Sequence, residues 1–264
     1  MKTALTIAGS DSSAGAGIQA DLRTFNDYGI HGVCAITAVT CQNTTGVNTI
    51  HQVPANIVAS QIETVVADIS VSAAKTGMLS NRSVVEVVAQ LITDLHIPSV
   101  VIDPVVVSSS GQRLLDTEAI GPLRTELLPK ATCITPNRME AELLSERQVK
   151  SLDDARDAAR CIVDLGVGAV VVTGGHFYSE NAIDIFCDGH DVIEFARPRL
   201  TQSSAHGTGC IFSAAITAAL AQGQPLPAAV NMAKSYVFEI MQRSITIGAG
   251  EKILTKHDKA TEPG

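Results

Sequence analysis

Short apolar runs rich in β-branched residues alternate with helical patterns along almost the whole chain. Each run is continuous and bounded by turn residues, which is typical of a strand buried on both faces of a sheet. Pro54 opens one helical pattern, and the spacing of Ser151 to Asp154 fits a capping pair before another, residues 153–165. The alternation predicts a three-layer α/β/α fold with a mostly parallel sheet and helices on both faces. The predicted strands are residues 4–8, 33–39, 72–76, 99–102, 133–135 and 169–173.

One domain is enough to hold this pattern. The chain has 264 residues, of which 45% are hydrophobic, so it can bury a large core without a linker. We expect a single domain over residues 1–250 and a frayed, charged tail over residues 251–264. Residues 183–187 and 192–195, split by Asp188 and Gly189, predict a hairpin at a sheet edge. The unpaired backbone of such an edge favours a homodimer.

Charge and cysteine usage exclude several classes of protein. The formal net charge is -8, so non-specific binding to nucleic acid, which needs clustered lysine and arginine, is not expected. The first apolar run is too short for the core of a signal peptide or for a membrane span. The six cysteines form no C-x-x-C pair, which favours reduced thiols in the cytoplasm over a disulfide framework or a zinc site.

The segment 206–210, His-Gly-Thr-Gly-Cys, predicts an anion site at the start of a helix. An alanine-rich helical run, residues 211–221, follows it directly. The first N–H groups of a helix have no intrahelical acceptor and bind anions, and glycines let a ligand approach the backbone. At such a helix start the pKa of the Cys210 thiol is expected to be lowered, which gives a reactive thiolate. The alternative is a glycine turn that contains a small apolar cysteine.

Polar and glycine clusters follow the predicted strands. Ligands bind beyond the carboxyl ends of parallel strands, so we expect these clusters to meet on one rim of the sheet. The clusters are residues 9–11, Gln42 with Asn43, Gly77 with Met78, Asp103, Asn137, residues 174–176 and the segment 206–210.

Two known nucleotide motifs do not fit the chain. Residues 15–20 match the dinucleotide fingerprint G-x-G-x-x-A, but the end of the second strand lacks the acidic residue that binds the ribose. No Gly-Lys dipeptide occurs, so a Walker loop is absent as well. Nucleotide phosphates would then be held by the segment 206–210. Asp103 and Glu140 offer the oxygen ligands that Mg²⁺ prefers beside phosphates, although Asn137 and Glu140 fit a helix capping box equally well.

Six short motifs occur along the chain in one order. They are residues 4–11, 15–22, 75–78, 103–105, 135–137 and 206–210. Together they resemble the hydroxymethylpyrimidine/phosphomethylpyrimidine kinases of thiamine biosynthesis, in the ribokinase superfamily. The Gly-Thr-Gly-Cys sequence stands where sugar kinases have Gly-x-Gly-Asp. The resemblance implies a ribokinase-like fold and two successive ATP-dependent phosphorylations, of the hydroxymethyl group and then of the resulting monophosphate.

The resemblance also implies roles for individual residues. The Gln42 amide would pair with the ring nitrogen and amino group of the pyrimidine, because an amide both donates and accepts. Cys210 would stand where sugar kinases place their aspartate base. The residues implied for the pyrimidine pocket are Gly9, Asp11, Gln42, Met78 and Val105. Those implied for the nucleotide are Asn137, Thr173, His206 and Lys234. Those implied for Mg²⁺ are Asp103 and Glu140, and those implied for the transferring phosphoryl group are Gly207, Thr208 and Gly209.

The chain departs from the family pattern at several positions. Thr173 and Ser109 stand where lysines are usual, and Ala205 stands where a threonine is usual. The two missing charges concern the nucleotide contacts more than the fold. A pyridoxal kinase of the same scaffold and a catalytically weak pyrimidine-binding relative therefore stay open as alternatives, and Gln42 favours the pyrimidine.

Overall fold

The computed structural model describes residues 1–108, 111–175, 180–200 and 205–256. These residues form a sheet of nine strands in the order β3-β2-β1-β4-β5-β6-β7-β8-β9. The six central strands are parallel, as predicted. They are β2 (His31–Asn43), β1 (Thr3–Asp11), β4 (Ala73–Thr76), β5 (Val100–Ile102), β6 (Cys133–Ile134) and β7 (Val170–Val172). The flanking strands β3 (Gly46–Gln52), β8 (Asn181–Cys187) and β9 (Val192–Pro198) run antiparallel to their neighbours.

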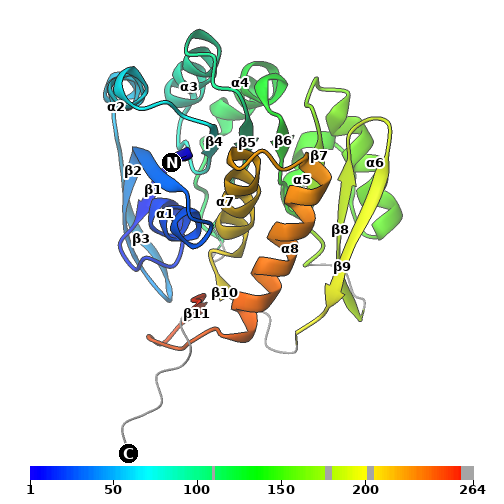
Figure 1. Ribbon diagram of the computed structural model, residues 1–264. Coiled ribbons are helices and arrows are strands. Elements are labelled where there is room, and N and C mark those ends of the chain that lie inside the picture. Colours follow the sequence, from blue (N-terminus) through cyan, green and yellow to red (C-terminus); the bar gives the residue numbers. More distant parts are fainter. Residues whose placement is uncertain (109–110, 176–179, 201–204, 257–264) are drawn as a thin grey trace, which may run out of the picture.

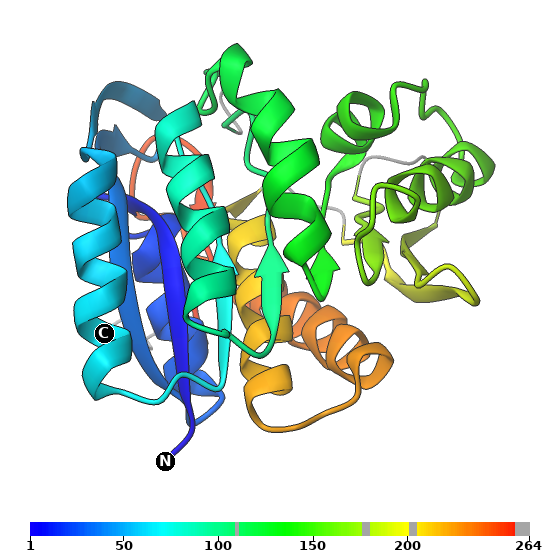
Figure 2. The same cartoon turned by 90° about the horizontal axis from the view of Figure 1, so that it is seen from above.

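Helices cover both faces of the sheet, which confirms the three-layer prediction (Figures 1 and 2). Alternate residues of the short central strands face opposite layers: Val100 and Ile102 belong to one core cluster, and Val101 belongs to another. The helices on the face of Val101 are α1 (Gly17–Asp27), α7 (Thr208–Ala221) and α8 (Leu226–Gln242). Those on the other face are α2 (Ala55–Asp68), α3 (Arg82–Asp94), α5 (Arg138–Ser145) and α6 (Leu152–Val163), with short helical turns over residues 117–130 that include α4 (Ile120–Pro122).

Two strands are longer than the apolar runs predicted. β1 continues to Asp11 and β2 continues to Asn43, past a register shift between Ala8 and Ser10. The clusters 9–11 and 42–43 therefore lie within strands, and the prediction that they follow the strands as loops is wrong. β3 was not predicted, because its side chains are largely exposed and it pairs only as an antiparallel edge.

The predicted edge hairpin is confirmed by β8 and β9, and β9 is the last strand of the sheet. The homodimer expected from this edge stays a prediction. No helix in the described part of the chain is both long enough and apolar enough to cross a membrane.

The ordered chain continues past residue 250, where we expected the tail to begin. β11 (Lys252–Ile253) pairs in parallel with β10 (Ala205–His206), below α7 in Figure 1. Ile253 and Leu254 are buried, and the Glu251 N–H donates to the carbonyl of Thr44. Two apolar residues thus anchor a segment whose overall composition is charged. The last part of the predicted tail, residues 257–264, lies outside the described residues.

A buried ion pair joins the centre of the sheet to α1. Lys75 of β4 is completely buried, and its Nζ lies 2.8 Å from Oδ1 of Asp21 in α1. The Thr6 hydroxyl donates to the other Asp21 oxygen at 2.6 Å. Burial lowers the pKa of Lys75, but the attraction and hydrogen bond of Asp21, together with the attraction of Cys210 and Asp103, outweigh burial and raise this pKa. Lys75 therefore keeps its charge inside the protein.

We predict that Asp21→Ala lowers the free energy of unfolding by about 3–5 kcal/mol, because it leaves the buried Lys75 without its nearest counter-charge. Urea unfolding measures the change. The double variant Asp21→Leu/Lys75→Met removes both charges and should recover a large part of the loss. A single variant that loses less than about 1 kcal/mol, the value of an exposed pair, would contradict this account.

Candidate active site

The start of α7 is open backbone, as the segment 206–210 predicts. Gly207 precedes the helix with a φ of 81° and carries no side chain that could cap it. A Cβ at Gly207 would lie 2.0 Å from the carbonyl oxygen of Gly15, so only glycine fits. Gly209 differs: it is exposed, and outside its own helix the nearest described atom to a Cβ there would be Asp103 Oδ2, at 3.8 Å. Packing does not require glycine at 209, which leaves the approach of a ligand as the reason for it.

Asp103 lies beside this helix start. Its carboxylate accepts a hydrogen bond from the Ser213 hydroxyl at 3.2 Å, and the same hydroxyl lies 3.0 Å from the carbonyl oxygen of Cys210. The loop after β5 is thereby tied to the first turns of α7. Burial raises the pKa of Asp103 to about 6, against the attraction of Lys75.

The helix cap predicted at Asn137 and Glu140 is present. Asn137 Oδ1 accepts from the Glu140 N–H at 3.1 Å, and Glu140 Oε2 accepts from the Asn137 N–H at 2.9 Å. The second oxygen of Glu140 reaches the Val106 N–H at 3.4 Å, in the loop that follows Asp103. Burial and the Asp103 carboxylate together raise the pKa of Glu140 to about 8. Burial is the larger cause of this rise, and the repulsion between the two carboxylates is the part that a cation beside them would relieve.

A cation at this place would need further ligands. No group of three or more His, Cys, Asp or Glu side chains in the described ranges could hold a metal ion. Asp103 and Glu140 therefore fit a hard cation that takes its remaining ligands from water and phosphate oxygens, the habit of Mg²⁺.

The predicted thiolate at Cys210 is wrong for the free protein. Cys210 is half-buried in the first turn of α7, and burial raises the pKa of its thiol to about 12. The Lys75 ammonium lowers this pKa, but the Asp103 carboxylate raises it further. The sequence correctly indicated the helix start and a carboxylate, Asp103, near it, but not the burial that raises the pKa of the thiol.

Asp11 uses its carboxylate to fold its own loop. Its Oδ1 accepts from the N–H and the hydroxyl of Ser13, each at 2.8 Å. Its Oδ2 accepts from the N–H groups of Gly15 and Ala16, at 3.0 and 2.8 Å. Burial opposes ionisation, but the hydrogen bonds from His206, Ser13 and Ala16 lower the pKa of Asp11 to about 2. Asp11 thus organises the loop, and its oxygens already have donors.

The glycines of the dinucleotide-like fingerprint serve this loop as well. Gly17 has a φ of 59°, and a Cβ there would lie 2.4 Å from the carbonyl oxygen of Gly9. A Cβ at Gly15 would lie 2.4 Å from the ring of His206. Close packing inside the protein explains both glycines without a dinucleotide.

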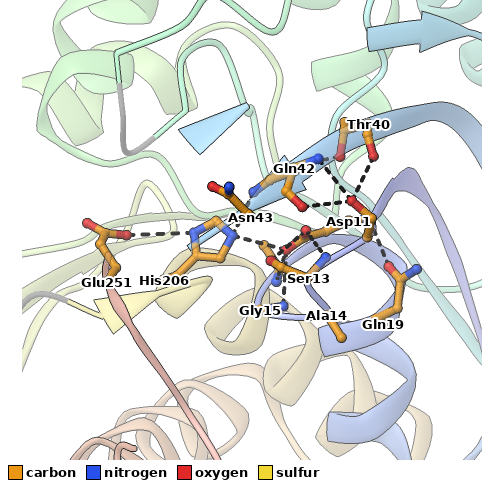
Figure 3. Close-up of polar contacts among 12 residues, drawn as sticks. Asp11, Ser13, Ala14, Gly15, Gln19, Thr40, Gln42, Asn43, His206 and Glu251 are labelled. Carbon is orange, nitrogen blue, oxygen red and sulfur yellow. Dashed lines mark hydrogen bonds and ion pairs between the residues drawn. The ribbon is translucent and has the colours of Figure 1, made fainter. Parts of the chain in front are cut away.

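His206 lies with the residues predicted for the pyrimidine (Figure 3). Its Nε2 is 3.0 Å from Asp11 Oδ2 and 2.7 Å from Gln42 Nε2. We expected His206 to contact the nucleotide, and its contacts instead belong to the substrate group. Gly9 and Met78 are neighbours in that group, since a Cβ at Gly9 would lie 3.2 Å from the Met78 sulfur. Val105 lines a small cavity together with Gly77 and Asp103.

Of the residues predicted for the nucleotide, Asn137 and Thr173 follow the ends of β6 and β7, and Lys234 lies in α8. The Thr173 N–H donates to the carbonyl of Pro136 at 3.0 Å, which brings Thr173 next to the loop of Asn137. Lys234 is engaged by Asp184, with its Nζ 2.7 Å from Oδ1, and the same oxygen accepts from the Gly174 N–H. Ser109, Ser110 and His176, where the sequence departs from or continues the family motifs, lie outside the described residues.

Sequence reasoning assigned no role to three residues that shape the site. Lys75 and Asp21 carried a signal, since each is a charge within an apolar pattern, which requires a buried partner. Glu251 carried none: its carboxylate lies 3.7 Å from His206 Nδ1, a contact that depends on the pairing of β11 with β10.

We predict that Cys210 is alkylated slowly by iodoacetamide at pH 7, because the thiol and not the thiolate is present. Cys41 is exposed on β2 and is the internal reference. Mass spectrometry of the carbamidomethylated peptides measures both rates. Modification of Cys210 before Cys41 at pH 7 would restore the activated thiolate predicted from the helix start.

Comparisons with known proteins agree with this arrangement. The model of the family described as phosphomethylpyrimidine kinase matches residues 11–255. A hydroxymethylpyrimidine/phosphomethylpyrimidine kinase of Synechococcus elongatus is 46% identical over 249 residues, 94% of each chain. The ADP complex of Bacillus subtilis pyridoxal kinase superposes with a TM-score of 0.90 at 37% identity, over 97% of each chain. The phosphomethylpyrimidine kinase of Clostridium difficile superposes with a TM-score of 0.82 at 38% identity, over 91% of this chain and all of that one. The chain thus belongs to the phosphomethylpyrimidine kinase family and has its ribokinase-like fold.

Proposed function

We propose that this protein is an ATP-dependent kinase that phosphorylates 4-amino-5-hydroxymethyl-2-methylpyrimidine and then its monophosphate, in thiamine biosynthesis. Family membership over almost the whole chain supports this activity. The observation that carries it is the start of α7, where the exposed Gly209 leaves its backbone open beside Asp103 and Cys210. Oriented N–H groups at this point suit the charge that develops on a transferring phosphoryl group.

The nucleotide phosphates would extend from Gly207, Thr208 and Gly209 towards Asn137 and Thr173. Mg²⁺ held by Asp103 and Glu140 would neutralise phosphate charge during transfer. Lys234 would position the backbone after β7 without contacting the phosphates. It pairs with Asp184, and Asp184 accepts a hydrogen bond from the Gly174 N–H. This chain therefore offers the phosphates backbone dipoles in place of the two lysines that are usual in the family.

The pyrimidine would lie against Gly9, Met78 and Val105, with its polar edge on the Gln42 amide. These residues line the carboxyl ends of β1, β2, β4 and β5, next to the start of α7. Asp11 contributes through the loop that it folds and through His206, since its oxygens are already occupied.

In the transfer step the substrate oxygen forms a bond to the γ-phosphorus, the bond from that phosphorus to the β-phosphate oxygen breaks, and the hydroxyl proton leaves. Cys210 is the residue we propose to receive this proton. Because burial holds the free thiol in its protonated form, Cys210 must first lose its own proton. The Asp103 carboxylate raises the pKa of Cys210, so neutralisation of Asp103 favours the thiolate.

A pyridoxal kinase is the second candidate, because a protein with that name superposes over 97% of the chain. Gln42 separates the two candidates, since its amide matches a ring nitrogen beside an amino group. A catalytically weak pyrimidine-binding relative is the third candidate and follows from the missing lysines.

We predict that the protein forms ADP with the hydroxymethylpyrimidine at a kcat/KM at least about tenfold above that with pyridoxal, the worth of one well-paired hydrogen bond. A coupled assay for ADP with both rings measures this. A preference for pyridoxal would assign the second candidate, and binding of the pyrimidine without ADP formation would assign the third.

We also predict that Gly209→Ala lowers kcat/KM for ATP by about 10²-fold or more, because the added methyl group occupies the space of the phosphate. The thermal midpoint should stay close to that of the wild type, since the nearest protein atom is 3.8 Å from the new Cβ. Gly121→Ala is the matched control: Gly121 is helical, and a Cβ there would meet nothing within 4 Å outside its own helix. Equal kinetics for the two variants would remove Gly209 from the phosphate site.

A further inference from the structure

His206 is buried between two carboxylates and the Gln42 amide (Figure 3). Its Nε2 lies 2.7 Å from Gln42 Nε2 and 3.0 Å from Asp11 Oδ2. On the other side of the ring, Nδ1 lies 3.7 Å from Glu251 Oε2. One ring nitrogen therefore meets both Asp11 and Gln42, and its hydrogen decides how all three groups pair.

The His206 Nε2 must carry a hydrogen. Asp11 is ionised and is an acceptor only, with Ser13, Gly15 and Ala16 as its other donors. A bare Nε2 would place its lone pair against the Asp11 carboxylate at 3.0 Å. An N–H at His206 Nε2 donates to Asp11. An N–H of Gln42 cannot then point at the His206 N–H, because two donors would meet. The atom of Gln42 that faces His206 is therefore the carbonyl oxygen, with the amide turned over about its terminal bond.

Thr40 supports this orientation independently. Its hydroxyl lies 3.0 Å from the Ser10 carbonyl oxygen and 3.0 Å from the other end of the Gln42 amide. A hydroxyl has one hydrogen, and the Ser10 carbonyl can only accept. With the amide turned over, the NH₂ of Gln42 donates to Thr40 and Thr40 donates to Ser10. The Thr40 hydrogen and the Gln42 hydrogen that faces Thr40 then have one acceptor each, and the hydrogen on His206 Nε2 is shared between Asp11 Oδ2 and the Gln42 oxygen.

We infer that His206 is a positioning residue that fixes the Gln42 amide with its oxygen on the His206 side and its NH₂ on the Thr40 side. This inference rests on the proposed function, in which the free edge of the amide pairs with the pyrimidine. The substrate must then place its amino group on the His206 side and its acceptor nitrogen on the Thr40 side. His206 thus selects the ring by the order of donor and acceptor along its edge.

The surroundings of His206 hold the ring in place. A Cβ at Gly15 would lie 2.4 Å from His206 Cδ2, so the loop of Asp11 packs directly on the ring. His206 lies in β10, which pairs with β11, and Glu251 just before β11 is bonded to the Thr44 carbonyl. The hydrogen bond between His206 and Gln42 therefore depends on segments that are far apart in the sequence.

A matched pair of ligands tests the selection. The 4-amino ring presents an acceptor nitrogen beside a donor amino group, and its 4-oxo analogue presents a ring N–H beside an acceptor oxygen. Binding the analogue in the same pose requires the opposite amide orientation, which would set the Gln42 NH₂ against the His206 N–H. We expect the wild type to bind the 4-amino ring more tightly, and we expect His206→Leu to lower the ratio of the two affinities by about tenfold, because the amide becomes free to turn.

Titration calorimetry with both rings, without nucleotide, measures the ratio independently of turnover. His206→Gln restores an N–H near the position of Nε2 and should keep the ratio within about threefold of the wild type. Ser13→Ala is the control, since it removes a hydrogen bond to the other Asp11 oxygen and leaves the contact between His206 and Gln42. Its effect on the two ligands should be equal. Thermal unfolding verifies that each variant is folded.

The outcomes separate this inference from the proposed function. A His206→Leu protein that loses the same factor for both rings would overturn the positioning role while the kinase activity stands. The positioning role is also overturned if His206→Gln loses the preference for the 4-amino ring to the same extent as His206→Leu. A wild type that binds neither ring overturns the proposed function, and the inference falls with it. If His206→Leu does not fold, loss of the preference in a folded His206→Gln overturns the inference, and its retention supports it.

Discussion

A charged lysine in the middle of the sheet sets the conditions for the whole site. Lys75 is inaccessible to water, so its charge must be balanced by groups of the protein. Asp21 balances it directly from α1, and the carboxylate of Asp103 and the thiol of Cys210 lie within reach of its field. The pair thus joins β4, α1 and the start of α7 electrostatically. The proposed site for phosphate and Mg²⁺ would thus lie beside a region in which charge is already distributed between fixed partners.

Close backbone contacts also join β1, the loop of Asp11 and the start of α7. Gly17 packs on Gly9, Gly207 packs on Gly15, and Gly15 packs on the ring of His206. Each contact is too close for a Cβ, so β1, the loop of Asp11 and the start of α7 can meet only through glycine. These contacts fix the distance between the proposed pyrimidine pocket and the proposed phosphate cradle. Gly209 is the exception, because the space beside it is open.

The sequence predicts what depends on local pattern. Short apolar runs predicted the central strands, because both faces of the sheet are buried there: Val100 packs into the core on one face and Val101 into the core on the other. The helix start at Thr208 and the cap at Asn137 followed from residue types at adjacent positions. Contacts between distant segments could not be predicted. The pKa of Cys210 depends on Asp103 and Lys75, and the place of His206 depends on β11, where composition suggested a tail.

The two halves of the site differ in how far they are prepared before a ligand arrives. On the proposed pyrimidine side, Asp11, Thr40, Gln42 and His206 are already hydrogen-bonded to one another, so a ring that pairs with Gln42 would meet an amide whose donor and acceptor are held in one order. On the phosphate side, Lys234 is neutralised by Asp184, and Thr173 replaces a lysine. In the proposed function, positive charge there would come from the backbone of α7 and from a cation at Asp103 and Glu140, which would also relieve the repulsion that contributes to the raised pKa of Glu140. In the proposed function, recognition of the ring is therefore built into the folded chain, whereas stabilisation of the phosphates depends on the cation that binds with them.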